Sequence, residues 1–160
     1  PLLDYHCQDL PYEVEFHAIN PRKKEVIFED RTLTIETIPL KHKVPTCGFL
    51  FTEHHRDREP RKRYAYCSDT AYREQIIEQI AGVEVLFHEA TYTEKDADKC
   101  KKHTHSTAKQ AAQIAKLAGA GKLIIGHFSA REDDHVVFLN EAKEVFDNTV
   151  LAVEKEKIEI

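Results

Sequence analysis

Two apolar runs that each end at a histidine constrain the fold of this chain more than any other feature. Residues 83–87 lead into His88 and Glu89, and residues 122–126 lead into His127. Near-continuous apolar runs of this length are typical of strands that are covered on both faces, as in a parallel sheet. Because α/β proteins assemble active sites where such strands end, the polar residues after each run become candidates for chemistry.

Helical patterns lie between and after these two runs. Residues 93–102 are charged and predict a surface helix. Thr107 with Gln110 fits a capping box, and the alanine-rich stripe that follows stops at Gly119. Residues 136–146 predict a further helix. Strand and helix therefore alternate through the second half of the chain, which places it in the α/β class.

The rest of the chain predicts mainly strands. Alternating apolar and polar side chains predict a half-buried strand at 12–19, and a hairpin is expected from 26–28 and 32–38. The remaining expected elements are a helix tail at 1–10, strands at 48–51, 64–67, 149–153 and 157–160, and an amphipathic helix that carries Ile76, Ile77 and Ile80 and stops at Gly82.

Composition limits the classes of function. The chain has 160 residues, which suits one domain spanning 1–160, and its 41% hydrophobic and 32% charged residues describe a globular protein. No apolar run approaches the roughly 20 residues of a membrane span, and no basic-then-apolar start predicts a signal peptide. We therefore expect a cytoplasmic protein with free thiols at its four cysteines. With a net charge of −5, any contact with a polyanion must be local.

Six histidine and carboxylate residues fall at boundaries between expected elements. Imidazole nitrogens and carboxylate oxygens are the ligands of zinc sites, and a carboxylate can bridge two cations. Ordinary hydrogen bonding would account for the same residue types, and both interpretations stay open at this point. The six are His42, Asp69, His88, Glu89, His105 and His127.

Several motifs together resemble ribonuclease Z, the tRNA 3′-processing endonuclease family of the metallo-β-lactamase fold. The sequences HEATY at 88–92, HST at 105–107 and HFSAR at 127–131 carry the resemblance. SDT at 68–70 and LKHKVP at 40–45 resemble the family's preceding motifs. The resemblance runs from about residue 26 to residue 153. It implies the C-terminal half of an αββα sandwich, in which a mixed sheet is covered by helices.

The resemblance also implies roles for individual residues. His42 would bind one zinc ion, His127 the other, and Asp69 would bridge them. Glu89 would orient the imidazole of His105, which can stabilise the scissile phosphate or protonate the leaving 3′ oxygen. Precursor tRNA is the implied substrate, and a homodimer is the implied assembly.

Other positions receive weaker assignments. His88 and Thr91 are expected to shape the turn, and Arg131 to contact phosphate or form a structural salt bridge. Residues 53–63 stand where bacterial members of the family carry a long arm that grips tRNA, so the arm is shortened or missing here. The basic stretch is either a solvated surface loop or a contact for the phosphate backbone. Its candidate substrate-binding residues are Arg61, Lys62 and Arg63.

One family motif is absent. The pattern H-x-H-x-D-H, which supplies most metal ligands in the family, does not occur in this sequence. Two zinc ions need about four ligands each, and this chain offers three in all. We therefore expect zero or one zinc for this chain alone, no activity on its own, and identity as the C-terminal half of the enzyme, in agreement with a start that lacks Met. The alternatives are a non-catalytic RNA-binding or dimerising half, or a hydrolase of the same fold for small phosphodiesters.

Overall fold

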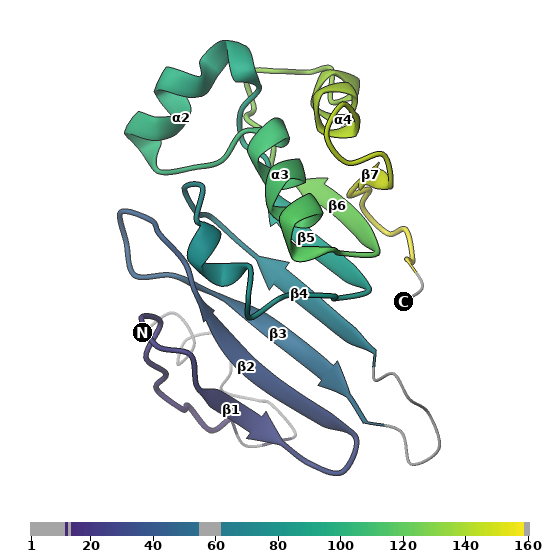
Figure 1. The fold of residues 1–160 in the computed structure, drawn as a ribbon. Coiled ribbons are helices and arrows are strands. Elements are labelled where there is room, and N and C mark those ends of the chain that lie inside the picture. Colours follow the sequence, from purple (N-terminus) through teal and green to yellow (C-terminus); the bar gives the residue numbers. More distant parts are fainter. Residues whose placement is uncertain (1–11, 13, 55–61, 159–160) are drawn as a thin grey trace.

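A seven-stranded mixed sheet organises the computed structural model, which describes residues 12, 14–54 and 62–158 (Figure 1). The strands lie side by side in the order of the sequence. The helix tail expected at 1–10 lies outside the described residues, as does most of the stretch 53–63. The strands are β1 (Val26–Glu29), β2 (Leu33–Pro39), β3 (Cys47–Glu53), β4 (Arg63–Cys67), β5 (Val85–Glu89), β6 (Lys122–Gly126) and β7 (Thr149–Leu151).

The first four strands are antiparallel. The hairpin of β1 and β2 is confirmed, and Asp30 stabilises its turn by accepting hydrogen bonds from the backbone N–H groups of Thr32 and Leu33. Gly48 allows β3 to approach β4, because a Cβ at this position would lie 2.2 Å from the carbonyl oxygen of Tyr66. This part of the sheet therefore depends on one close backbone contact.

The last four strands are parallel, and α-helices join β5 to β6 and β6 to β7. These helices are α2 (Ala97–His103), α3 (Ala108–Ala118) and α4 (Val136–Lys143). The predicted capping box of Thr107 and Gln110 opens α3, and Gly119 closes it in the left-handed conformation with φ 63°. The predicted α/β class with a mixed sheet is confirmed.

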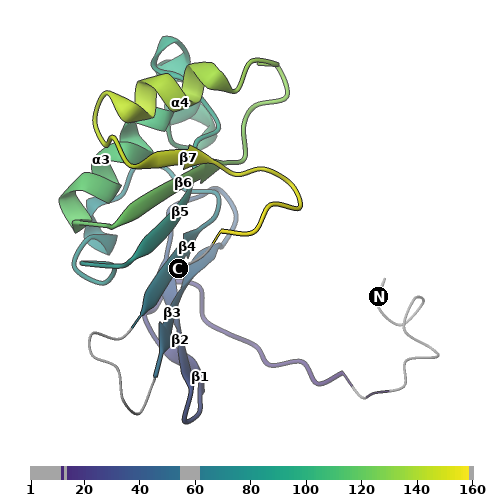
Figure 2. The same ribbon diagram turned by 90° about the vertical axis from the view of Figure 1, so that its right-hand side faces the viewer.

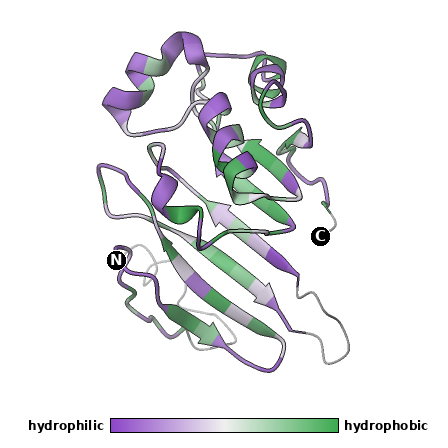
Figure 3. Ribbon diagram, viewed as in Figure 1, coloured by the Kyte–Doolittle hydropathy of each residue, from purple (hydrophilic) through white to green (hydrophobic). Residues whose placement is uncertain are grey.

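Helices α3 and α4 lie on the same face of the sheet, which Figure 2 shows on edge. The core between these helices and the sheet contains the fully buried side chains of Leu86, Ile114, Leu123 and Phe138. Apolar colouring is densest on β5 and β6, whereas α2 is mostly hydrophilic (Figure 3). None of the helices formed by the described residues has the length and apolar character that crossing a membrane requires.

Three predictions of local structure were wrong. Residues 14–20 form no strand, because no neighbouring strand pairs with them, and Phe16 is 71% exposed. The expected helix before Gly82 is a short 3-10 helix, η1 (Glu74–Ile76), followed by turns. The apolar residues that suggested a helix, Ile76 and Ile80, are buried in the core. Residues 157–158 are irregular, and residues 159–160 lie outside the described range.

Candidate active site

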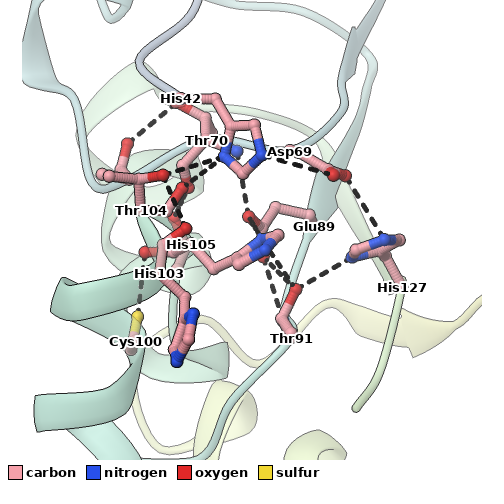
Figure 4. A network of polar contacts seen from close by, with 12 residues as sticks. His42, Asp69, Thr70, Glu89, Thr91, Cys100, His103, Thr104, His105 and His127 are labelled. Atoms are coloured by element: carbon pink, nitrogen blue, oxygen red, sulfur yellow. Dashed lines mark hydrogen bonds and ion pairs between the residues drawn. The ribbon is translucent and has the colours of Figure 1, made fainter. Parts of the chain in front are cut away.

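The topology of the sheet brings four of the predicted site residues to one edge. Strand β3 is antiparallel to both β2 and β4, so β2 runs in the same direction as the parallel strands β4, β5 and β6. Their carboxyl ends therefore meet at one edge of the sheet, which is where α/β proteins bind ligands. His42, Asp69, Glu89 and His127 follow or end these four strands, and the link between α2 and α3 adds His105 (Figure 4).

Asp69 lies between two imidazoles. Its Oδ2 is 4.0 Å from Nε2 of His42, and its Oδ1 is 3.3 Å from Nε2 of His127. The first separation is too long for a hydrogen bond. Each carboxylate oxygen thus faces a different imidazole nitrogen, as expected of a residue that could bridge two cations.

The orientation of His42 leaves its Nε2 available for a metal. Its Nδ1 lies 3.0 Å from the carbonyl oxygen of Thr104, which can only accept a hydrogen bond. Nδ1 therefore carries a proton, and Nε2 faces Asp69. Thr104 ends α2 in the left-handed conformation, with φ 61°, which is unusual for a β-branched residue. Metal-bound histidines are commonly oriented by a carbonyl in this manner.

Glu89 is fully buried and accepts four hydrogen bonds. Its Oε1 accepts from the N–H of Thr70 at 2.9 Å and from Nδ1 of His105 at 2.7 Å. Its Oε2 accepts from the N–H and the hydroxyl of Thr91, at 3.0 and 2.7 Å. Burial alone would raise the pKa of the Glu89 carboxyl, but the hydrogen bonds outweigh it and lower that pKa. Glu89 is therefore a carboxylate with every lone pair directed at a donor.

Thr91 connects the carboxylate to a candidate metal ligand. Its hydroxyl donates to Glu89, so the oxygen is free to accept from Nδ1 of His127 at 2.9 Å. This contact orients the ring so that Nε2 of His127 faces Asp69. We predicted from the sequence only that Thr91 shapes the turn. The spacing Glu-x-Thr after a strand is the available signal, but it does not reveal a contact with a histidine 36 residues away.

His105 occupies the centre of the cluster. Its Nδ1 is hydrogen bonded to Glu89, and that hydrogen bond is the largest cause of a raised pKa of the His105 imidazole. Its ring centroid lies 4.9 Å from that of His42 and 5.5 Å from that of His127. Among the described residues, Nε2 of His105 makes no hydrogen bond. A protonated His105 could therefore present an N–H to a ligand held between the two other imidazoles.

The donor set fits zinc in type. Two groups of three residues each have their ligand atoms within 4.8 Å of one another. One group is His42, Asp69 and His105, and the other is Glu89, His105 and His127. The lone pairs of Glu89 are already used, and Nδ1 of His105 is bound to it, so Asp69, His42 and His127 are the better candidate ligands. Among the described residues these provide three ligands, fewer than two tetrahedral zinc ions require.

The remaining predicted residues fall outside the centre of the site. His88 is fully buried and its Nδ1 donates to the carbonyl oxygen of Glu89, which agrees with a structural role. Arg131 is exposed and lines a cavity of about 170 Å³ that also contacts Thr91. Arg63, with Lys62 beside it, lies at the opposite end of β4 from Asp69. The guanidinium of Arg63 donates to the carbonyl oxygens of Gln79 and Ala81. Arg61 lies outside the described residues.

Comparisons with known proteins show which family this chain resembles. The profile of the beta-lactamase superfamily domain matches residues 3–128. Ribonuclease Z of Phocaeicola vulgatus is 41% identical over an alignment of 203 positions that covers 100% of this chain and 66% of the relative. Ribonuclease Z of Parabacteroides distasonis is 37% identical, with coverage of 100% and 67%. The crystal structure of the short form of human tRNase Z has a TM-score of 0.64 at 26% identity and covers 81% of this chain and 44% of that one.

The lengths of these proteins differ from that of the chain. This chain spans about two thirds of the curated relatives that it matches, at 66% and 67%. The alignment with the Phocaeicola vulgatus protein has 203 positions, although the chain has 160 residues. Within the aligned region, the relative therefore contains residues that this chain lacks.

Proposed function

Since the chain belongs to the ribonuclease Z family of the beta-lactamase superfamily, we propose that the complete protein is a zinc-dependent phosphodiesterase that removes 3′ trailers from precursor tRNA. This chain would contribute part of the metal site and the groups that transfer a proton. The single observation that carries the proposal is the position of Asp69 between two oriented imidazoles, with the Glu89–His105 pair directly behind it.

The proposed metal ligands of this chain are His42, Asp69 and His127. Zinc ions held there would supply activation of water and polarisation of a phosphoryl oxygen. Thr104 and Thr91 would keep the two imidazoles in the tautomer that binds metal, because each fixes the proton on Nδ1. The further ligands would come from the part of the relatives' length that this chain does not span.

His105 and Glu89 would act on the leaving group. Cleavage breaks the bond between phosphorus and the 3′ oxygen of the tRNA, and that oxygen needs a proton to leave as a hydroxyl. The hydrogen bond with the Glu89 carboxylate raises the pKa of His105, which favours the protonated imidazole, and the ring would donate this proton from Nε2. Glu89 itself would stay ionised and orient the ring, since its oxygens are occupied by donors.

The second face of the sheet suggests where the rest of the domain packs. Phe49, Tyr66 and Phe87 are direct neighbours across β3, β4 and β5, and Phe51 stacks on Tyr64 at a centroid distance of 5.6 Å. These side chains are half-buried, and no helix of the described residues lies on this face (Figure 2). We propose that this aromatic face packs against the second sheet of the sandwich, formed by residues that the relatives have beyond the match. Residues 53–63 would then be a shortened arm in the same single domain.

Substitution of Glu89 in the full-length protein tests the assignment. Glu89→Gln keeps the shape of the side chain but removes the charge that raises the pKa of His105. Turnover of precursor tRNA should fall by about 10²–10⁴-fold, as for the loss of a general acid, while the zinc content stays at the wild-type level. The matched control is Glu144→Gln on the exposed surface, which should retain wild-type turnover. Retained cleavage in Glu89→Gln would refute the role of the pair.

The pH dependence of turnover gives a second test of the same pair. A general acid acts only when protonated, so turnover should decline as the pH rises through the raised pKa of His105. Because the hydrogen bond from Glu89 is the largest cause of that shift, Glu89→Gln should move the alkaline decline to lower pH. An alkaline limb at the same pH in both proteins would contradict the proposal.

The count of metal ligands favours a second candidate for the isolated chain. With three proposed ligands for two ions, the 160 residues alone would be a non-catalytic half that binds RNA or dimerises. Metal analysis of the purified chain distinguishes the two: zero or one zinc fits this candidate, and two zinc ions would contradict it. Assays with precursor tRNA and with a bis-aryl phosphodiester separate the tRNA enzyme from a hydrolase of small phosphodiesters.

Assembly and location complete the proposal. We infer a homodimer in the cytoplasm from membership of the ribonuclease Z family. Sedimentation of the full-length protein tests the first inference, and a mass of one chain at micromolar concentration would contradict it.

A further inference from the structure

Two short basic segments meet beside His42. One is the loop that follows β2, where Pro39 and Pro45 restrict the backbone. The other is the last turn of α2. The contacts of His42 Nδ1 with the carbonyl oxygen and with the hydroxyl of Thr104, both at 3.0 Å, join the segments (Figure 4). Together they place four exposed lysines at one side of the candidate active site, which we call the basic lip: Lys41, Lys43, Lys101 and Lys102.

The loop of the basic lip is also hydrogen bonded to the segment that follows β4. The N–H of Lys41 donates to the hydroxyl of Thr70 at 3.0 Å, and the N–H of Ala71 donates to the carbonyl oxygen of Lys41 at 2.8 Å. The loop is therefore attached to the segment that carries Asp69. The backbone positions of these lysines are set relative to the candidate metal ligands, although their side chains are long and exposed.

The lysines of the basic lip differ from others near the site in their partners. Within the described residues, Lys95 pairs with Glu132 at 2.6 Å and Lys99 with Asp96 at 2.6 Å. No ion pair within the described part of the chain involves the four lysines of the lip. A protein with a net charge of −5 thus carries, next to its site, a local group of four lysines that form no close ion pair with the described residues. Such a group repels itself unless an anion is bound.

We propose that the basic lip binds the backbone phosphates that flank the phosphodiester bond to be cleaved in an RNA. The inference rests on the proposed function and assigns to it a binding surface in this chain. Lysine ammonium groups bind phosphates as mobile point charges, without reading the sequence of bases. This suits an enzyme that acts on tRNA precursors with different trailers. The lip would add affinity and salt dependence, and the bond would be positioned by the residues around Asp69.

Salt titration of RNA binding tests the basic lip in the full-length protein. Two variants remove charge from it, Lys41→Gln with Lys43→Gln, and Lys101→Gln with Lys102→Gln. The control, Lys116→Gln with Lys143→Gln, removes the same charge from exposed positions on α3 and α4. Removal of one lysine–phosphate interaction should reduce the slope of log K against log salt by about 1. Each lip variant lacks two lysines, so its slope should fall by about 2 and it should bind precursor tRNA more weakly than the wild type at low salt, whereas the control should match the wild type.

The outcomes separate this inference from the proposed function. Equal slopes for the lip variants and the control would overturn the basic lip, even if the protein cleaves precursor tRNA normally. Binding that depends on the lip in a wild-type protein that does not cleave would support the lip and refute the proposed function. Comparison of a full trailer with a single-nucleotide trailer then locates the contacted phosphates, since a lip on the trailer side loses its salt slope with the shorter RNA.

Discussion

The parallel part of the sheet, from β4 to β7, and its antiparallel part, from β1 to β4, differ in what surrounds their strands. Strands β5 and β6 lie under α3, and Leu86 and Leu123 are fully buried there. Strand β1 is exposed along its whole length, with Phe28 46% exposed. The parallel part provides Asp69, Glu89 and His127 at its strand ends, whereas β2 provides only His42 through the loop that follows it.

The two parts of the sheet therefore hold their site residues in different ways. The buried strands fix the carboxylates, because β5 and β6 cannot shift without loss of packing against α3, and β4 is paired with β5. The antiparallel part extends away from the site and carries one ligand on a loop that is held by Thr104 and Thr70. We therefore expect changes in the parallel part to affect stability and the site together, and changes in the exposed edge strand β1 to affect neither strongly.

The largest contrast in stability should separate the centre of the sheet from its edge. Leu86→Ala removes a fully buried side chain and should lower the free energy of unfolding by about 2–5 kcal/mol. Phe28→Ala on the exposed strand β1 should change it by no more than about 0.5 kcal/mol. Urea denaturation of the two variants measures both values. Similar losses would mean that the edge strand is covered in the full-length protein.

Gly48→Ala probes the seam between β3 and β4. The added Cβ would lie 2.2 Å from the carbonyl oxygen of Tyr66, so the strands must separate. We expect a loss of about 1–3 kcal/mol in the free energy of unfolding, as for overpacking in a core. A neutral result would show that β3 can move independently of the parallel strands.

Thr107→Ala tests the start of α3, which covers the parallel strands. The variant loses the side-chain acceptor of the capping box and should be destabilised by about 1 kcal/mol. Thr107→Ser retains the hydroxyl and should retain most of the stability. Asp30→Ala removes three hydrogen bonds from the hairpin turn, and because this turn is exposed to solvent we expect a smaller loss there. A larger loss for the hairpin would reverse the comparison.

The same contrast explains what could be predicted from the sequence. Residues 122–126, the capping box and Gly119 were placed correctly, because burial and helix capping leave local signals. The alternation at 12–19 misled, since a strand also needs a neighbour, and no neighbour is visible in local spacing. The segment before Gly82 had helical spacing but folded as η1 and turns.

For the site too, local signals could be predicted and contacts between distant segments could not. His42, Asp69, Glu89, His105 and His127 were predicted from strand ends and from motifs, and the structure brings them together. Their roles remain predictions. The contacts of Thr104 and Thr91 could not be predicted, because each joins segments far apart in the sequence. Lys62 and Arg63 were expected to contact substrate, yet they lie at the opposite end of β4 from Asp69. They could contact the substrate only if the RNA extends from the site to that end of the strand.

The role of His105 as the acid for the leaving 3′ oxygen is the central claim, and a sulfur substitution tests it most directly. A precursor tRNA with bridging sulfur in place of that oxygen has a leaving group that departs without a proton. The measurement is the single-turnover cleavage rate of His105→Ala and wild-type full-length protein on both RNAs. We predict a loss of about 10²–10⁴-fold on the oxygen substrate and near wild-type cleavage of the sulfur substrate. An equal loss on both substrates would contradict the account.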